Sequence, residues 1–348
     1  MEQENSKIEF VLKTVPSSEF IGSPKIEQNQ TRAGYGDALV ELGEKNPNVV
    51  VLTGDLADST KVSAFKKKFP ERFIEVGVAE QNMMGIAAGL ALSGKIPFVS
   101  SYATFSPGRS WDQLRVSVAY SKANVKVAGA HTGVSVGPDG ATHQALEDIA
   151  ITRVLPDLVV IVPCDTIQTK KATLAAAAHE GPVYFRFTRE KSAVFTTEET
   201  PFEIGKAQLI RDGKDVAIIG SGPVLYNGLL AAIELEKEGI SVLVLNNHTI
   251  KPIDSEAITA VARKCGAVVT IEEHQTMAGC GSAVCEVLAQ NFPVPVEMIG
   301  MQNTFGESGE PDELIERFGM GKDAVVAAIK KVLERKMNLT NLSKRKVI

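Results

Sequence analysis

The stretch RFIEVGVAEQNMMGIAAGLAL, Arg72–Leu92, contains the two kinds of segment from which this fold is built. Its first part, Arg72–Gly77, is strand-like, and Glu80–Leu92 carries apolar side chains at helical spacing. The earlier segment Asn48–Thr53, NVVVLT, is short and nearly all apolar, as in a strand that is covered on both faces. Because such strands alternate with helices along the chain, the sequence predicts a doubly wound α/β fold with a parallel sheet.

The alternation extends in both directions. Further strands of a first unit are predicted at Ile96–Ser101, Val125–Ala130, Leu158–Val162 and Val183–Phe187, with helices at Gly34–Lys45, Trp111–Lys122, His143–Val154 and Ile167–His179. A second unit has strands at Asp215–Ile219, Ile240–Leu245, Ala267–Ile271 and Val296–Gly300, with helices at Leu225–Lys237, Ser255–Lys264 and Gly281–Gln290 and two more within Glu310–Lys336. The pattern therefore predicts two α/β domains.

Polar, less regular segments set the predicted domain boundaries. Residues 1–30 read as an arm or linker, followed by a first domain at 31–195. A connection at 196–208 leads to a smaller second domain at 209–337, and 338–348 are expected to be a frayed tail.

Composition excludes several classes of protein. The 348 residues are 44% hydrophobic and carry a net charge of −5, which argues against nucleic acid as the main partner. No apolar run approaches the ~18 residues of a membrane span, and the start of the chain lacks the features of a secretory signal. The four cysteines form no CxxC pair, so we expect reduced thiols and a cytoplasmic protein.

Glu80 is a candidate catalytic residue because it opens a helix directly after a strand. A carboxylate in the first turn of a helix is favourable in its own right, so its position alone does not require chemistry. The small residues Gly85, Ala87, Ala88 and Gly89 indicate close packing around this helix. A carboxyl group buried there would have a raised pKa and could donate or accept a proton.

Other polar and aromatic residues follow predicted strands at their carboxyl ends, where open α/β sheets bind ligands. Aromatic side chains at such a crevice can sandwich a flat ring, although many are simply part of the core. A glycine-rich loop that carries both a carboxylate and an imidazole is less easily explained by packing. The set comprises Tyr102, Phe105, His131, Asp139, His143, Arg186 and Arg189.

Two further patterns indicate no site. Gly220-Ser221-Gly222-Pro223 follows a strand, but Leu225 stands where a dinucleotide fingerprint needs its third glycine. The five histidines include no closely spaced pair of the kind that binds zinc; we interpret His179 and His248 as surface or loop residues and His274 as structural.

Taken together, these segments resemble the carboxyl-terminal half of the transketolase family of thiamine-diphosphate enzymes. The resemblance runs from about Thr31 to Lys336. The segments that carry it are TRAGYGDAL (31–39), GDLADST (54–60), GVAEQNMMGIAAGLA (77–91), SSYATF (100–105), WDQLR (111–115), GPDGATHQ (137–144), FTRE (187–190), TIKPID (249–254) and VTIEEH (269–274).

The resemblance implies a pyrimidine-binding domain followed by a transketolase C-terminal domain. The glutamate that matches Glu80 hydrogen-bonds N1′ of the cofactor's aminopyrimidine and favours its imino tautomer. Phe105 and Tyr102 would pack against the pyrimidine, with His131 nearby. Tyr102 departs from the family's usual phenylalanine, and its hydroxyl then needs a partner.

On the substrate side, the resemblance implies that Asp139 hydrogen-bonds the ketose near its C2 hydroxyl and that His143 meets the C1 hydroxyl. The family's phosphate-binding set matches Arg32, Ser59, His131 and Arg189. Two guanidiniums, a hydroxyl and an imidazole suit a phosphate group, so sugar phosphates are the expected substrates.

The family holds the diphosphate and Mg²⁺ through a separate domain with a GDG motif, which this sequence lacks. We therefore expect a split transketolase whose N-terminal partner subunit supplies these ligands, in an α₂β₂ assembly around a dimer of this chain. The alternatives are a 2-oxoacid dehydrogenase β subunit, which lacks the GxDGxTHQ loop, a deoxyxylulose-phosphate-synthase-like enzyme, which is a longer chain, and a non-catalytic scaffold subunit.

Overall fold

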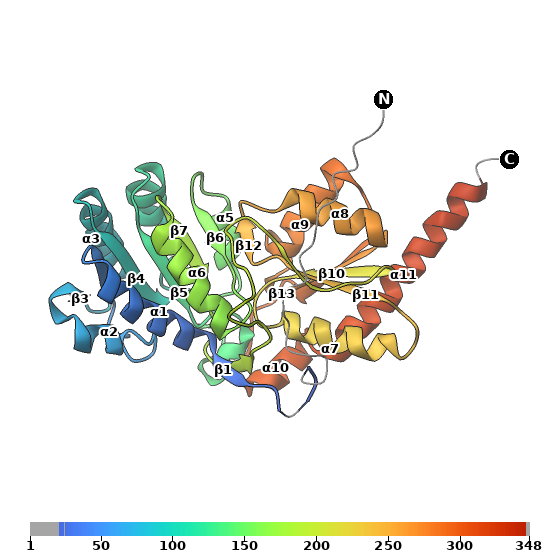
Figure 1. The fold of residues 1–348 in the computed structure, drawn as a ribbon, viewed down its shortest axis with the longest axis horizontal. Coiled ribbons are helices and arrows are strands. Elements are labelled where there is room, and N and C mark those ends of the chain that lie inside the picture. Colours follow the sequence, from blue (N-terminus) through green and yellow to red (C-terminus); the bar gives the residue numbers. More distant parts are fainter. Residues whose placement is uncertain (1–20, 24, 346–348) are drawn as a thin grey trace.

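The computed structural model describes residues 21–23 and 25–345, and it confirms the two predicted α/β domains (Figure 1). The first sheet has seven strands in the order β12-β6-β7-β5-β4-β2-β3. Their bounds are β2 (Val49–Thr53), β3 (Phe73–Glu75), β4 (Ile96–Tyr102), β5 (Lys126–Ala130), β6 (Val159–Ile161), β7 (Val183–Arg186) and β12 (Thr249–Lys251). All except β12 pair in parallel.

Helices cover both faces of this sheet, which explains the apolar runs in its strands. Every residue of β2, β5 and β7 is buried. The helices are α1 (Thr31–Lys45), α2 (Ser63–Lys68), α3 (Glu80–Leu92), α4 (Trp111–Gln113), α5 (Asp148–Arg153) and α6 (Thr166–Ala178), with short η1 (Pro70–Arg72) and η3 (Val134–Asp139). Because the strands are parallel, their carboxyl ends lie along one edge of the sheet.

The second sheet has five strands in the order β14-β13-β10-β11-β9. These are β9 (Gln208–Arg211), β10 (Val216–Gly220), β11 (Val242–Asn246), β13 (Val268–Gln275) and β14 (Val296–Met301), of which β9 alone runs antiparallel. They are flanked by α7 (Leu225–Glu236), α8 (Ser255–Cys265), α9 (Cys280–Asn291), α10 (Pro311–Arg317) and α11 (Lys322–Arg345).

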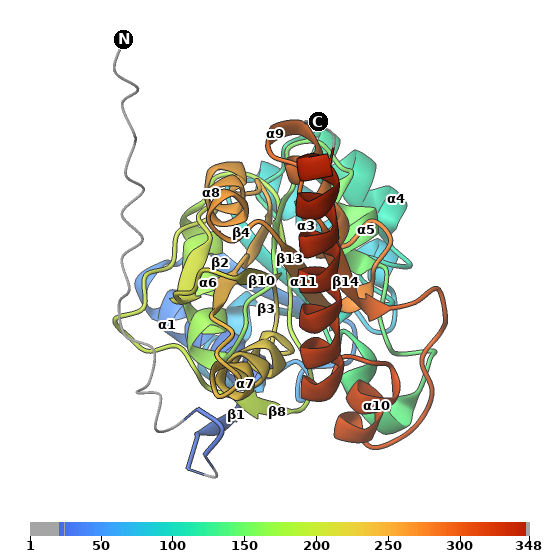
Figure 2. The same ribbon diagram turned by 90° about the vertical axis from the view of Figure 1, so that its right-hand side faces the viewer.

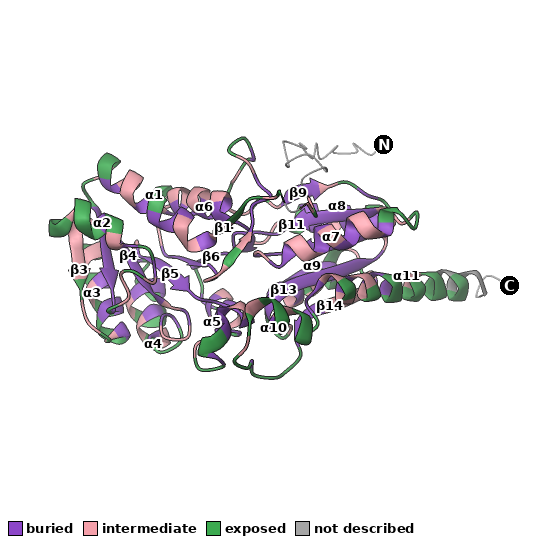
Figure 3. Cartoon of the chain, turned by 90° about the horizontal axis from the view of Figure 1, so that it is seen from below, coloured by how far each residue is buried: buried purple, intermediate pink, exposed green. Residues whose placement is uncertain are grey.

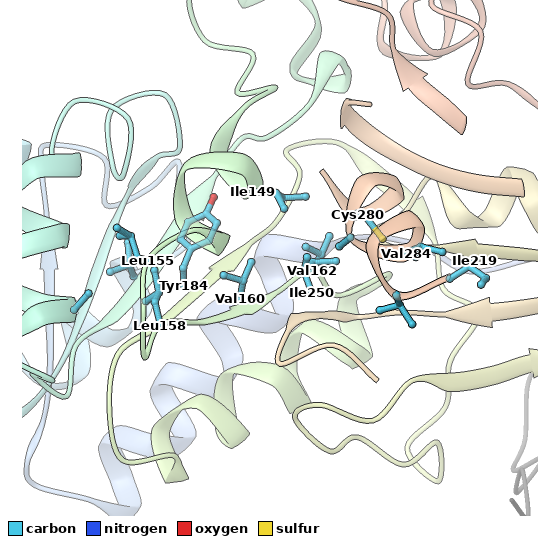
Figure 4. Packing of buried hydrophobic residues seen from close by; sticks show 14 of the residues in the cluster. Ile149, Leu155, Leu158, Val160, Val162, Tyr184, Ile219, Ile250, Cys280 and Val284 are labelled. Atoms are coloured by element: carbon cyan, nitrogen blue, oxygen red, sulfur yellow. The ribbon is translucent and has the colours of Figure 1, made fainter. Parts of the chain in front are cut away.

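The two domains share one hydrophobic core. Strand β12, which follows β11 of the second domain, pairs with β6 of the first, and Val162 donates its N–H to His248 O at 2.7 Å. Val162, Ile250, Cys280 and Val284 belong to one buried cluster that crosses the boundary (Figure 4). This continuity fixes the two domains against each other at the edge where the site lies.

One predicted helix is substantially wrong. His143–Val154 is helical only from Asp148, and His143 lies in a loop. Ala145 instead pairs with Thr132 in a parallel bridge, and Leu146 O accepts the N–H of Gln275 from the second domain at 2.8 Å. These long-range hydrogen bonds hold the segment extended in place of the local helix.

Three smaller predictions also need correction. The predicted arm at 1–30 contains a strand, β1 (Gln28–Gln30), that pairs with β8 (Lys191–Ala193). Residues 1–20 and 24 of this arm lie outside the described residues. The predicted helix at Trp111–Lys122 is mostly a wider π-helical segment, η2 (Leu114–Tyr120). The tail at 338–348 continues α11 as far as Arg345; Figure 1 shows this helix projecting beyond the second domain, and Figure 2 shows it in front of that domain.

Burial follows the layers of the fold, with buried strands between helices that are exposed on their outer faces (Figure 3). All four cysteines are free. Within residues 21–23 and 25–345, no helix is long and apolar enough to cross a membrane.

Candidate functional site

The predicted site residues meet at the carboxyl edge of the first sheet, where β4, β5 and β7 end. Helix α3 places Glu80 there at its first residue, and β4 ends at Tyr102. His131 directly follows β5 and has a φ of +54°, which turns the chain sharply away from the strand. The site is thus assembled from residues that are distant in the sequence.

Glu80 is buried, with a side-chain exposure of 1%. Its Oε2 accepts a hydrogen bond from Arg109 Nη1 at 2.7 Å, and Ser101 Oγ lies 3.5 Å from Oε1. Arg109 has half of its side chain in solvent (49%), and its guanidinium carbon lies 4.6 Å from the centroid of the Phe105 ring. The buried carboxyl therefore faces a planar donor that rests on an aromatic ring.

Four rings form one cluster, which Phe105 joins to Arg109 and so to Glu80. Tyr102 and Phe105 are nearly parallel, with centroids 6.0 Å apart and an interplanar angle of 21°. His143 meets the Phe105 ring edge-on at 5.4 Å, and His131 lies 4.0 Å from Tyr102. Stacked rings beside a buried carboxyl suit a flat heteroaromatic group with a basic ring nitrogen, so the residues fit an aminopyrimidine.

A cationic cluster adjoins the rings. Arg32 Nη1 lies 3.2 Å from His131 Nε2 and donates to Ser59 O at 2.7 Å. Burial, together with the charges of Arg32 and Arg189, lowers the pKa of His131 to about 3, so its ring is neutral at pH 7. Burial and the charge of Arg189 also lower the pKa of Arg32. Two guanidiniums this close are suited to bind an anion.

The ring nitrogens of His131 have distinct roles. Because a guanidinium only donates, Nε2 accepts from Arg32 and the proton stays on Nδ1. Among the described residues, His131 Nδ1 and Arg32 Nε are buried without a hydrogen bond. Buried donors of this kind are costly unless a ligand completes them.

The loop between β5 and α5 supplies the remaining residues. Arg189 Nη1 donates to Asp139 Oδ1 at 3.3 Å and to Val136 O at 3.1 Å. His143 Nδ1 lies 2.8 Å from Thr142 Oγ1. Asp139 and His143 are thereby brought to the same edge as Glu80, as the sequence predicted.

Arg186 does not lie with Glu80, Asp139 and His143, although the sequence predicts it among the residues of the ligand-binding crevice. It is buried, and its Nε lies 3.0 Å from Asp148 Oδ2. Nη2 also donates to Glu273 O at 3.2 Å, so the residue links the domains. Similarly, Gly222 has a φ of +75° and an added Cβ would lie 3.4 Å from Val162, so the Gly220–Pro223 turn packs against the first domain.

Sequence reasoning missed three residues that contact the site or its loop: Arg109, Gln144 and Glu273. Their contacts join segments up to 163 residues apart, and the local pattern of a single sequence does not indicate which distant segments meet. No group of three or more His, Cys, Asp or Glu side chains within residues 21–23 and 25–345 is placed to hold a metal ion.

Comparisons with known proteins identify the family of both domains. Residues 27–193 match the family "Transketolase, pyrimidine binding domain", and residues 205–325 match "Transketolase, C-terminal domain". A putative transketolase C-terminal section from Methanocaldococcus jannaschii is 44% identical over 87% of this chain and 96% of its own length. A 6-deoxy-6-sulfo-D-fructose transketolase subunit from Clostridium sp. is 43% identical over 90% of this chain and 97% of its own length.

A solved structure is also similar. A split gene transketolase, described as an inactive β4 tetramer, superposes with a TM-score of 0.83 at 48% identity, covering 88% of this chain and 99% of its own. With both family domains matched along most of its length, this chain belongs to the transketolase family and carries the family's pyrimidine-binding and C-terminal domains.

Proposed function

We propose that this chain is the C-terminal subunit of a split, thiamine-diphosphate-dependent transketolase that moves a two-carbon ketol unit from a ketose phosphate to an aldose phosphate. One observation carries the proposal: the buried Glu80 carboxyl lies beside stacked rings, with the Arg32–His131 pair on the other side of Tyr102.

Thiamine diphosphate, when bound, supplies the electron sink for breaking the bond next to a ketose carbonyl. Glu80, whose side chain is buried, would hold a proton at N1′ of the aminopyrimidine. Phe105 and Tyr102 would pack against the ring and orient it. In this structure Arg109 donates a hydrogen bond to the Glu80 carboxylate, so the guanidinium must turn away when the aminopyrimidine ring binds there.

On the substrate side, the cluster of Arg32, Ser59, His131 and Arg189 would bind the sugar's anionic end. Asp139 would accept a hydroxyl hydrogen of the ketose, and His143, beside Phe105, would contact the hydroxyl nearest the reacting carbon. Binding at both ends positions the carbon chain between the cofactor and the cradle.

Diphosphate and Mg²⁺ would be held by a partner, the N-terminal transketolase subunit, because no GDG motif occurs in this sequence. The relatives that match over nearly their full length are named as a C-terminal section and as a subunit, which supports this arrangement. A cytoplasmic location is also proposed, in keeping with four free thiols.

The identity of the sugar is a separate question. Relatives are named for 6-deoxy-6-sulfo-D-fructose and for apulose 4-phosphate. A sulfonate and a phosphate are both oxyanions that a guanidinium pair can bind. The transfer assay should therefore compare four donors: xylulose 5-phosphate, fructose 6-phosphate, sedoheptulose 7-phosphate and a sulfonated ketose.

This chain would also associate with itself, as the dimer at the centre of an α₂β₂ assembly. Gly85, Gly89 and Leu92 lie on one face of α3, and in the described part of the chain no atom outside that stretch of helix backbone comes within 4 Å of a Cβ added at either glycine. Leu92 is 72% exposed, and Tyr120 at the end of the neighbouring η2 is 85% exposed. Small residues beside exposed apolar ones favour close helix packing.

Titration calorimetry and a transfer assay test the proposal. The lone chain is expected to bind no thiamine diphosphate with Mg²⁺; after mixing with an N-terminal transketolase chain, binding and ketol transfer to ribose 5-phosphate should appear. Glu80→Gln in the complex should reduce turnover at least 100-fold. Turnover by the lone chain would refute the proposal that the enzyme is split between two subunits. Full turnover by the Glu80→Gln complex would show that this chain acts only as a scaffold.

A further inference from the structure

The loop that carries Asp139 and His143 is held from the second domain, which contributes no residue to the site described above. Residues 133–147 cross from β5 to α5, and three segments of the second domain reach them: the end of β13, residues 306–308 and the start of α10. Besides the backbone hydrogen bond from Gln275 N to Leu146 O, two side chains, Glu273 and Gln144, make polar connections.

Glu273 makes the shorter connection. Its Oε1 accepts the backbone N–H of Ser135 at 2.6 Å, and only 6% of the residue is exposed. A Cβ added to Gly133, which has a φ of +84°, would lie 2.1 Å from the same oxygen. The backbone of the loop therefore approaches the carboxylate as closely as glycine allows.

Burial raises the pKa of Glu273, whereas its hydrogen bond with Ser135 lowers it. Burying a carboxylate costs stability unless hydrogen bonds and nearby charge offset it; here Ser135 supplies a hydrogen bond and Arg186 a nearby positive charge. A cavity of about 370 Å³, lined by both Ser135 and Glu273, adjoins the contact. Val134, next to Ser135, is buried in a hydrophobic cluster with residues of the second domain, so the hydrogen bond and this apolar packing together hold the loop here.

Gln144 makes the second connection, one residue after His143. Its Nε2 donates to Val134 O at 3.1 Å, within the loop, and to Glu307 O at 2.8 Å, in the second domain. A Cβ added to Gly306 would lie 1.9 Å from its Oε1, so this approach is equally close. The contacts of Glu273 with Ser135 and of Gln144 with Glu307 thus hold the loop on either side of Asp139.

We propose that Glu273 is a positioning residue for the transfer reaction, which holds the Ser135–His143 loop so that Asp139 and His143 face the donor sugar. This inference rests on the proposed function. It gives the second domain a direct part in recognising the donor, and it predicts that changes at Glu273 affect the donor KM more than the binding of thiamine diphosphate, whose contact at Glu80 is on another element.

Three variants in the assembled complex test it, with xylulose 5-phosphate as donor and ribose 5-phosphate as acceptor. Glu273→Leu removes the acceptor and should raise the donor KM about tenfold, the effect of an unpaired buried N–H. Glu273→Gln keeps an oxygen for Ser135 and should restore most of the affinity. The Kd for thiamine diphosphate should stay within twofold in both.

Glu286→Gln is the matched control. Arg153 of the first domain donates to Glu286 of α9 at 3.2 Å and through a second, shorter contact, so this pair also links the domains. It touches no residue of the 133–147 loop. A general weakening of the domain contact would affect both variants, whereas a positioning role would affect Glu273→Leu alone.

A second readout needs no partner and no sugar. Hydrogen exchange of the lone chain should show the amides of residues 134–143 exchanging at least tenfold faster in Glu273→Leu, with β5 and β13 still protected. If Glu273→Leu does not fold, Gln144→Leu breaks the other connection and should give the same pattern of exchange and KM.

The outcomes separate the two proposals. A wild-type complex that transfers no ketol unit defeats the proposed function, whatever the exchange rates show. A working complex in which neither Glu273→Leu nor Gln144→Leu changes donor KM or loop exchange defeats the positioning role. An equal KM rise in Glu286→Gln would do the same.

Discussion

At the scale of single residues, the pairing of Glu80 with Arg109 is the contact with the clearest energetic consequence. A buried carboxylate without a partner is strongly destabilising, and Arg109 is the cation that faces Glu80 at 2.7 Å. Since half of the Arg109 side chain is in solvent, its contribution should be less than that of a fully buried ion pair.

A double-mutant cycle measures this contribution. Arg109→Met keeps an unbranched apolar side chain but removes the guanidinium, and it should lower the free energy of unfolding of the lone chain by about 1–2 kcal/mol. In a Glu80→Gln background the same change should cost less than about 0.5 kcal/mol, because no charge is left unpaired. Urea unfolding of the four proteins gives the coupling, and equal costs in both backgrounds would show that the two residues are not coupled.

The phosphate cradle supports a second prediction about single residues. Arg32→Ala or Arg189→Ala in the complex should raise the KM for a sugar phosphate about 10-fold or more, with a smaller fall in kcat, because each removes a charge-assisted contact to a group remote from the reacting carbon. Arg335→Ala, whose guanidinium contacts Glu297 in the second domain, is the matched control. An unchanged KM in the cradle variants would remove those residues from the binding site.

How far the sequence predicts individual residues depends on how local their signals are. Glu80, His131 and Asp139 could be predicted as site residues because each follows a strand or lies in a distinctive loop. Arg109 was missed, because nothing within SPGRSW distinguishes its side chain from a solvated arginine. Its partner lies 29 residues away, across the edge of the sheet.

At the scale of elements, local periodicity predicted the strands and helices wherever local forces decide. Helix α3 begins and ends where the pattern indicated, at Glu80 and Leu92. Strand β12 was missed because it has three residues and pairs with a strand of the other domain. Residues 143–147 were expected to be helical because their hydrogen-bond partners, including Gln275, are too distant for periodicity to detect.

The β11–β12 connection leads to a prediction about pH. His248, expected to lie in a loop or at the surface, is buried in that connection, stacked on Phe202 with ring centroids 4.4 Å apart. Burial lowers its pKa from 6.5 to about 3. Below pH 6.5 the unfolded chain therefore binds a proton that the folded chain does not, so the stability that is present above pH 6.5 is lost as the pH falls towards 3.

Through His248 alone, the free energy of unfolding should be about 2 kcal/mol lower at pH 5 than at pH 7.5. His131 and His274 have pKa values lowered to about 3 and about 4, so they act in the same direction. His248→Gln should make the dependence on pH shallower, measured by urea unfolding at pH 5, 6 and 7.5. An unchanged slope would show that another group titrates instead.

At the scale of the whole molecule, the two domains form one unit with a site on an open edge. Their common core, from Val160 in the first domain to Val284 in the second, explains why the site loop can be braced from across the boundary. The face of α3, by contrast, has no neighbour at Gly85 and Gly89 among residues 21–23 and 25–345 within 4 Å of an added Cβ. That face of α3 is thus a candidate contact surface for another chain.

Gly85→Glu tests whether a second copy of the chain covers that face. Glutamate favours a helix over glycine by up to about 1 kcal/mol, so the variant should fold at least as stably as the parent chain. Sedimentation velocity should nonetheless show dissociation, with the self-association Kd raised at least 10-fold, because two buried carboxylates would meet near the axis of a symmetric contact. Val154→Glu, at an exposed position beside α5, is the control and should leave association unchanged. If Gly85→Glu associates as the parent does, the dimer contact lies elsewhere and the open face of α3 is available to the N-terminal subunit.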